Sequence, residues 1–195
     1  MSIAYKIGKY VPRLFKPIAK RLYVSTYLRF MQPSGTFHGI PLPPKTLASE
    51  VGGGNFMKIG KGSVDLLVSL GGLQSFHHVL DVGCGIGIVA IPLSAFLDKN
   101  GSYEGFDIDE LMVKWCQTYI TSRYPNFNFR VAGLRAGDSP IEGNPSIWTF
   151  PYKSESFDLV FLFSVFTHMF PNETENYLSE INRVLKSGGK VLATF

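Results

Sequence analysis

The chain has 195 residues, of which 45% are hydrophobic and 17% are charged, a composition typical of a globular protein with one sizeable core. Its longest apolar run, residues 159–166, has eight residues and includes Ser164. A helix needs about 20 apolar residues to cross a bilayer, so the sequence predicts no transmembrane segment. The two cysteines, Cys84 and Cys116, show no disulfide framework and no zinc-ligand spacing. They indicate a cytoplasmic protein without a metal site.

The net charge of +4 is divided unevenly along the chain. Residues 1–50 carry eight Lys or Arg against one acidic residue, whereas residues 51–195 carry eleven basic and fourteen acidic residues. The basic charge therefore belongs to an N-terminal segment and not to the body of the protein. This distribution argues against a nucleic-acid-binding domain.

Residues 1–49 are predicted to form an arm and a linker. Residues 1–31 mix basic residues with aromatic and aliphatic ones, and a helix is expected over residues 18–31. Two interpretations remain open: peripheral contact with an anionic membrane or a partner, or a solvated arm that packs partly on its own domain. Residues 32–55 are rich in Pro and Gly, which is typical of a linker or a lid.

The remaining segment, residues 50–195, is predicted to be one domain in which strands alternate with helices. Strands are expected over residues 78–82, 102–108, 127–131, 157–163 and 190–195, and helices over 61–70, 88–97, 110–124 and 173–185. This alternation predicts an α/β fold with a doubly wound, Rossmann-like parallel sheet and helices on both faces.

A glycine-rich loop, residues 83–87, follows the first predicted strand of this domain. Ligands of open parallel sheets bind at the carboxyl ends of the strands, and glycines let a ligand approach the backbone closely. A dinucleotide fingerprint would need glycine at position 88, which is Ile88. Asp107 ends the second strand, where a carboxylate can accept both hydroxyls of a ribose. Its alternative role is that of a helix N-cap or turn residue, for which Asp109 competes.

Four stretches in the order of the chain resemble motifs of the class I S-adenosylmethionine-dependent methyltransferases. Residues 79–87 are similar to motif I and residues 105–108 to motif II. Residues 150–160 resemble the approach to the fourth strand, and residues 183–189 the turn into the fifth. The type-11 branch, whose members act on small molecules or lipids, is the most similar, also around residues 164–169. The resemblance implies S-adenosyl-L-methionine as cofactor and a seven-stranded sheet.

The resemblance also implies roles for individual residues. Those expected to bind the methionine part of the cofactor lie at the first strand and the glycine loop: Asp81, Gly83, Cys84, Gly85 and Gly87. Asp107 is expected to hold the ribose, Ile108 to lie against the adenine, and Ser164 to lie near the methyl group. The family often has an acid facing the adenine just after the third strand; no carboxylate stands closer to that place than Asp138.

The predicted activity is methyl transfer to an unidentified small-molecule or lipid-like acceptor. His168 is the candidate general base, with a capping or packing role at a loop–helix junction as its alternative. Two other functions remain open: a nicotinamide-dependent oxidoreductase, and an inactive methyltransferase-like binding or regulatory module. Because the chain ends at Phe195 within the fifth predicted strand, we expect a truncated domain or a partner that completes the sheet.

Overall fold

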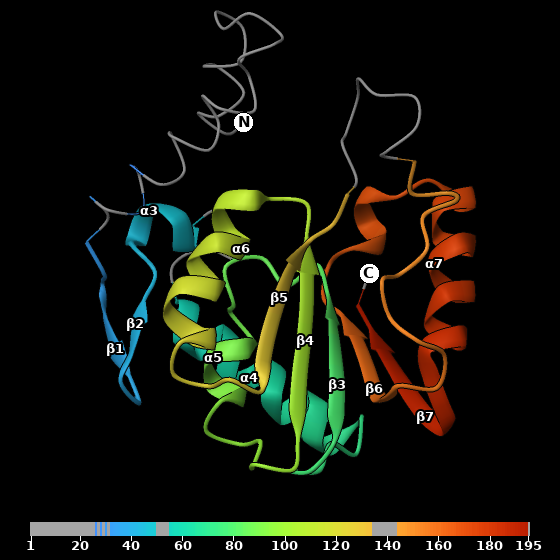
Figure 1. Cartoon of the computed structure of the whole chain (residues 1–195), viewed down its shortest axis with the longest axis horizontal. Helices are drawn as coiled ribbons and strands as arrows, with labels where there is room; N and C mark the ends of the chain where they lie inside the picture. The colour runs from blue at the N-terminus through green and yellow to red at the C-terminus, as the bar shows by residue number, and fades with distance from the viewer. Residues whose placement is uncertain are drawn as a thin grey trace, which may run out of the picture.

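The computed structural model describes residues 26, 28, 30, 32–49, 55–133 and 144–194. Most of the predicted arm, and Asp138, lie outside this part of the chain. The body is a five-stranded parallel sheet with helices on both faces (Figure 1), which confirms the predicted fold class.

The strand order of the sheet is β5-β4-β3-β6-β7. The bounds are β3 (His78–Val82), β4 (Ser102–Asp107), β5 (Phe127–Val131), β6 (Phe157–Leu162) and β7 (Leu185–Ala193). From the central β3 the chain adds β4 and β5 on one side and then crosses to add β6 and β7 on the other. The order therefore reverses between β3 and β6, and the carboxyl ends of strands at such a point form the ligand crevice of open parallel sheets.

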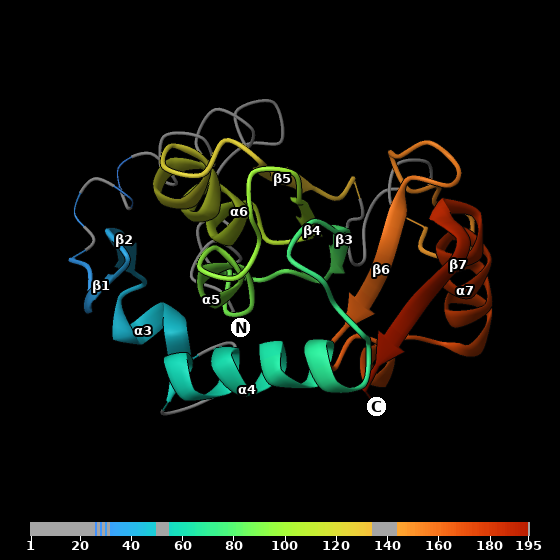
Figure 2. The ribbon, with the colours of Figure 1, turned by 90° about the horizontal axis from the view of Figure 1, so that it is seen from below.

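Each face of the sheet is covered by its own helices (Figure 2). One face packs against α4 (Phe56–Ser69), α5 (Ala90–Leu93) and α6 (Glu110–Cys116), and the other against α7 (Pro171–Val184). Strand residues alternate between the two cores: Val79 and Tyr103 face α4–α6, whereas Leu80 and Phe106 face α7. In the part of the chain that is described, no helix is long and apolar enough to span a membrane.

Several elements differ from their predicted bounds for local reasons. Helix α4 begins at Phe56, earlier than predicted, because the Asn55 side chain accepts a hydrogen bond from the Lys58 N–H at 3.2 Å. Helix α6 continues into a π-helical turn, η3 (Gln117–Thr121). Strand β7 begins at Leu185 and includes the residues predicted as a turn, which it accommodates by a register shift against β6.

The segment predicted as a linker or lid carries secondary structure. It contains an antiparallel hairpin of β1 (Gly35–Phe37) and β2 (Ile40–Leu42), followed by α3 (Lys45–Ala48). Leu47 of α3 is buried in one cluster with Ile86 of the glycine loop and Trp115 of α6. The segment thus packs directly on the element that carries the predicted site.

Candidate cofactor site

The glycine-rich loop after β3 is tied to the end of the neighbouring strand β4. The backbone N–H groups of Gly83 and Cys84 both donate to the Phe106 carbonyl, at 2.9 and 3.0 Å. Gly83, Gly85 and Gly87 all have positive φ, at 80°, 51° and 83°. A Cβ at position 83 would lie 2.6 Å from the Val165 Cγ2 atom, so the close approach of the chain after β6 also requires glycine there. The loop therefore lies between the ends of β4 and β6.

Asp107, at the end of β4, contacts this loop directly. Its Oδ2 accepts a hydrogen bond from the Gly85 N–H at 2.8 Å, and its Oδ1 accepts one from the Asp109 N–H at 2.9 Å. Asp109 itself caps α6 by accepting from the N–H groups of Leu111 and Met112. The helix cap is thus Asp109, and Asp107 joins the loop to the strand end. Burial raises the pKa of Asp107, partly offset by the backbone donors.

Asp81, near the end of β3, is almost fully buried, with 3% of its surface exposed. The Tyr103 hydroxyl donates to its Oδ2 at 2.6 Å. Burial raises the pKa of Asp81 from 3.8 to about 7; the Tyr103 hydrogen bond opposes this shift and the charge of Asp107 adds to it. Cys84 and Cys116 are buried beside these acids, and burial raises the pKa of both thiols. Two of the residues expected to bind the cofactor, Asp81 and Asp107, therefore have raised pKa values.

The remaining predicted residues surround this centre. Ser164 follows β6 with a φ of 58°, and its N–H donates to the Thr194 hydroxyl at 3.0 Å. Its neighbour Val165 contacts Gly83, which brings the end of β6 to the glycine loop. Ile108 is 56% exposed beside Asp107. His168 ends the short 3-10 helix η4 (Phe166–His168) and is exposed.

After β5, where the family often has an acid facing the adenine, the structure has Ala132. This residue is buried, and its N–H donates to the Asp107 carbonyl at 2.8 Å. Strand β5 is therefore joined to the end of β4 by the backbone. No carboxylate occurs among the described residues immediately after β5, namely 132 and 133.

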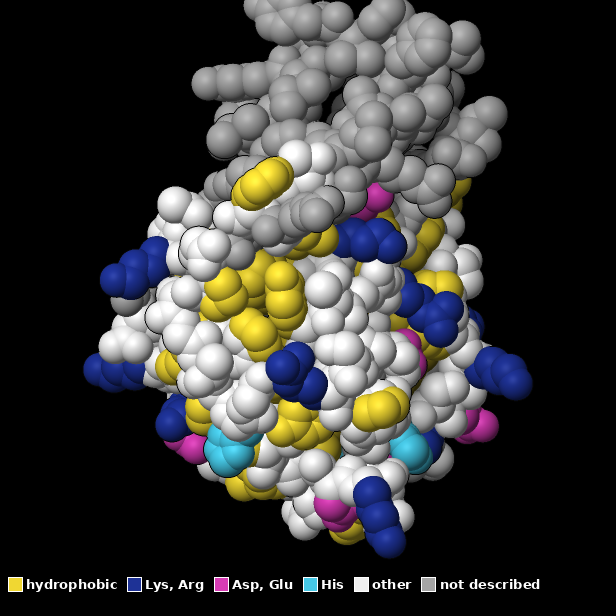
Figure 3. All heavy atoms as spheres, turned by 60° about the vertical axis from the view of Figure 1, so that its left-hand side comes forward, with side chains coloured by type: hydrophobic (Ala, Val, Ile, Leu, Met, Phe, Trp, Pro, Cys, Tyr) yellow, Lys and Arg dark blue, Asp and Glu magenta, His cyan; other side chains and the backbone are white. Residues whose placement is uncertain are grey.

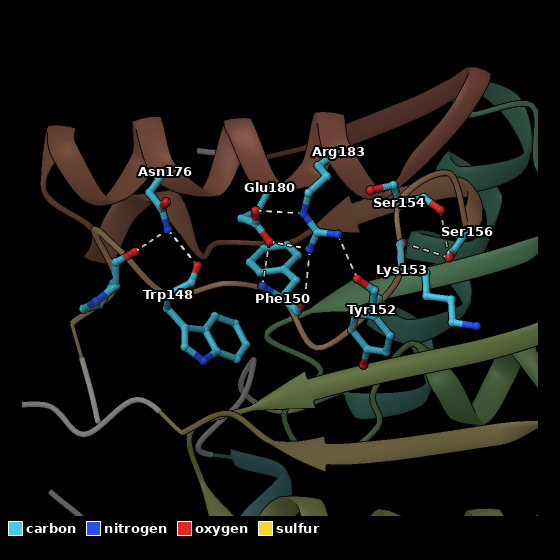
Figure 4. Close-up of polar contacts among 10 residues, drawn as sticks. Trp148, Phe150, Tyr152, Lys153, Ser154, Ser156, Asn176, Glu180 and Arg183 are labelled. Carbon is cyan, nitrogen blue, oxygen red and sulfur yellow. Dashed lines mark hydrogen bonds and ion pairs between the residues drawn. The ribbon is translucent and has the colours of Figure 1, made fainter. Parts of the chain in front are cut away.

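Sequence reasoning missed two features that support the site. The first is Tyr103; strand alternation places it on the same face of the sheet as Asp81, since Val79 is its partner in the register. The second is a clamp between α7 and the segment before β6 (Figure 4). Arg183 donates to the carbonyls of Phe150 and Tyr152 at 3.0 and 2.8 Å. No pattern in the sequence marks these backbone acceptors.

The clamp has two further members on the same side of α7. Glu180 accepts from the Phe150 N–H at 2.7 Å and from Arg183, and Asn176 donates to the carbonyls of residues 145 and 148. The clamped segment packs the rings of Trp148 and Phe150 against Phe106, each with centroids 5.0 Å apart. Because the Phe106 carbonyl accepts from the glycine loop, the clamp supports the strand end that holds this loop.

The part of the chain that contains the glycine loop and the clamp also matches a known protein family. A profile described as "Methyltransferase domain" matches residues 79–189, more than half of the chain. The chain belongs to this methyltransferase family. The cofactor indicated by the family is S-adenosyl-L-methionine, and the family decides against the nicotinamide-dependent alternative.

Individual relatives agree with this assignment. The chain is 29% identical over 128 residues to the ubiquinone/menaquinone biosynthesis C-methyltransferase UbiE of Wigglesworthia glossinidia brevipalpis, covering 66% of this chain and 46% of that protein. It is 32% identical over 123 residues to the demethylmenaquinone methyltransferase of Lactiplantibacillus plantarum, covering 62% and 45%. The crystal structure of PH0226 protein from Pyrococcus horikoshii OT3 aligns with a TM-score of 0.54 and 25% identity, covering 70% of this chain and 56% of that one. The chain thus spans about half the length of the curated relatives it matches.

Proposed function

We propose that this protein transfers a methyl group from S-adenosyl-L-methionine to a small, lipid-like acceptor. The observation that carries the proposal is the contact between Asp107 and Gly85. Through this contact, the Asp107 carboxylate and the glycine loop lie together near the point where the strand order reverses. A carboxylate there can bind ribose hydroxyls, and glycines let a ligand approach the backbone closely.

The residues at this point fit the chemical groups of the cofactor. The cofactor has an ammonium group, two ribose hydroxyls and an apolar adenine face. We assign the ammonium group to Asp81 and the ribose hydroxyls to Asp107, because both are carboxylates beside the loop. Ile108 offers an exposed apolar surface for the adenine next to Asp107. The loop residues Gly83, Cys84, Gly85 and Gly87 offer backbone without bulky side chains.

The cofactor supplies a methyl group on a sulfonium, which reacts by direct displacement. The protein's part is to bind and orient the two reactants in line, which can lower the barrier by several kcal/mol. Ser164 lies at the end of β6 beside the loop, where we place the acceptor side of the site. His168, exposed two residues beyond Phe166, is the proposed base for an acceptor that must lose a proton.

The lipid-like character of the acceptor is supported by two observations. The named relatives are a ubiquinone/menaquinone biosynthesis C-methyltransferase and a demethylmenaquinone methyltransferase. On the side of the molecule that carries β1 and β2, hydrophobic side chains gather in patches with Lys and Arg among them (Figure 3). We also propose that the basic N-terminal arm brings a cytoplasmic protein to an anionic membrane surface.

The test is a turnover assay that measures the demethylated cofactor formed with a panel of acceptors. We expect turnover with isoprenoid quinols and none with small polar amines. We also expect Asp107→Ala to abolish the turnover of the quinols. Turnover only with the polar acceptors would overturn the lipid-like assignment. Cofactor binding without turnover on any acceptor would favour the inactive binding module instead.

The membrane proposal has a separate test, which uses the whole chain. Sedimentation with vesicles containing anionic lipid should remove the protein from solution, and sedimentation with neutral vesicles should not. Binding to anionic vesicles should also weaken as the salt concentration rises, because exposed charges are screened. Equal recovery of soluble protein with both vesicle types would contradict this role.

A further inference from the structure

The buried phenol of Tyr103 packs against two aromatic rings of the neighbouring strand β5. Its side chain is fully buried. The ring stacks on Phe127, with centroids 5.1 Å apart and an angle of 12° between the planes, and lies against Phe129 at 5.2 Å. These contacts fix the direction of the ring, so the position of its hydroxyl is set by packing.

The path of the phenol to Asp81 depends on a glycine in the same strand. In the sheet register Gly105 lies opposite Asp81, and Tyr103 lies two residues earlier on the same face. A Cβ at position 105 would lie 2.9 Å from the Tyr103 Cε1 and Oη atoms and from the Cβ of Cys84. The absent side chain at Gly105 therefore leaves the space through which Tyr103 reaches Asp81.

The hydrogen bond from Tyr103 occupies only one of the two carboxylate oxygens of Asp81. The Tyr103 hydroxyl donates to Oδ2 at 2.6 Å, and among the described residues no donor to Oδ1 is found. The titratable groups that face Asp81 are Tyr103 and Asp107 from β4, Cys84 from the loop and Cys116 from α6. None of these is basic, so the described surroundings of Asp81 hold no cation that would balance its charge.

We infer that Tyr103 is a positioning residue for cofactor binding: it holds Asp81 by Oδ2 and so presents Oδ1 to the ammonium group of the cofactor. This inference rests on the proposed function, in which Asp81 receives that group. An ionised Asp81 beside the cofactor's ammonium group gains a charge partner that the described residues around it do not supply. Hydrogen bonds between charged groups of this kind are the strong ones.

The role of Tyr103 has a consequence for the pH dependence of binding. Burial raises the pKa of Asp81 to about 7 although the Tyr103 hydrogen bond lowers it, so the pKa should rise further without the hydroxyl. Cofactor affinity should therefore increase with pH through about 7 in the native protein. In Tyr103→Phe the same increase should occur at higher pH.

The experiment is calorimetric titration with S-adenosylhomocysteine, which keeps the ammonium group, at several pH values between 6 and 9 for the native chain, Tyr103→Phe and Asp81→Asn. We expect Tyr103→Phe to bind about 5-fold more weakly at pH 7 and within about 2-fold of the native protein at pH 9, with its midpoint shifted upward by about one pH unit. Titration of the ligand's own amine is common to all three proteins and cancels in the comparison.

The outcomes separate the inference from the proposed function. A loss in Tyr103→Phe that is the same at every pH, or no loss at all, would overturn the positioning role while Asp81→Asn still bound weakly. Native-like binding by Asp81→Asn would instead show that Asp81 does not hold the ammonium group, and the proposed assignment of Asp81 would fail. Thermal unfolding of each variant identifies a loss of folded protein.

Discussion

The polar groups at the glycine loop and those in the α7 clamp differ in how completely they are paired. In the clamp, Glu180 and Arg183 bind each other and the backbone of the segment before β6. The hydrogen bond from Arg183 lowers the pKa of Glu180. At the loop, burial instead raises the pKa values of Asp81 and Asp107. Both regions contain acidic side chains. Glu180 in the clamp has a basic partner, whereas Asp81 and Asp107 at the loop have none among the described residues.

This difference indicates which acids stabilise the fold and which are available to a ligand. The half-buried Glu180 has its pKa lowered by Arg183, so its ionised form is favoured in the folded protein. A buried acid without a cation instead reduces stability when it is ionised. The contrast supports the proposal that the clamp stabilises the fold and that the acids at the loop bind the cofactor. Four substitutions test this division, beginning with the largest expected effect.

Asp81→Asn should stabilise the protein at alkaline pH. The folded state binds a proton at Asp81 with a pKa of about 7, against an ordinary value of 3.8, so ionisation costs the native protein stability as the pH rises between these values. Removing the charge should raise the free energy of unfolding by about 4 kcal/mol at pH 8 and have little effect at pH 4. Urea unfolding at both pH values measures this. A destabilised variant at pH 8 would show that the charge of Asp81 is already compensated in the folded state.

Arg183→Ala should destabilise the fold by about 2 kcal/mol, because Glu180 and two carbonyls lose their donor. Arg183→Lys should recover only part of the loss, since lysine cannot reproduce the planar set of donors. Cofactor affinity measured on the folded variant should stay close to that of the native protein. If Arg183→Ala instead lost cofactor affinity while its stability in urea was unchanged, the clamp would act in cofactor binding and not in stability.

Gly83→Ala should cost about 1.5 kcal/mol in stability, because position 83 has a φ of 80° and the new Cβ would contact Val165. Cofactor affinity should fall as well, since Val165 adjoins Ser164. The matched control is Gly62→Ala: that exposed glycine lies within α4 with no neighbour within 4 Å of a Cβ, so alanine should stabilise the helix slightly. Equal thermal stability of the two variants would contradict the close approach at position 83.

Lys186→Ala should have the smallest effect, no more than about 0.5 kcal/mol. Lys186 pairs with Asp158 at 2.8 Å, but both side chains are partly exposed to solvent, at 35% and 26%. The Asp158 carboxylate also keeps its hydrogen bond from the His78 N–H. A loss comparable to that of Arg183→Ala, measured in the same urea experiment, would remove the distinction between exposed and clamped pairs.

The sequence predicted the parallel sheet well because its signals are local. Apolar strands such as residues 157–163 and glycines after a strand follow from short-range patterns, and the five predicted strands all occur. The hairpin within residues 32–49 was not predicted, because its stability depends on packing against the domain, where Ile40 is fully buried. Likewise, the sequence around Tyr103 is that of an ordinary strand. Only the register of the sheet shows that Tyr103 lies near Asp81. The sequence predicts that the glycine loop and Asp107 follow strands of the sheet, but it does not predict their hydrogen-bond partners.

The most direct test of the central claim is calorimetric titration of the whole chain with S-adenosyl-L-methionine, its demethylated product and NAD. Asp107→Ala is the test variant, and Asp109→Asn is the matched control because asparagine also caps a helix. We predict micromolar binding of the first two ligands, no binding of NAD, a loss of about 30-fold or more in Asp107→Ala and retention in Asp109→Asn. Absence of binding by folded native protein, or unchanged affinity in folded Asp107→Ala, would contradict the assignment of the glycine loop and Asp107 as the cofactor site.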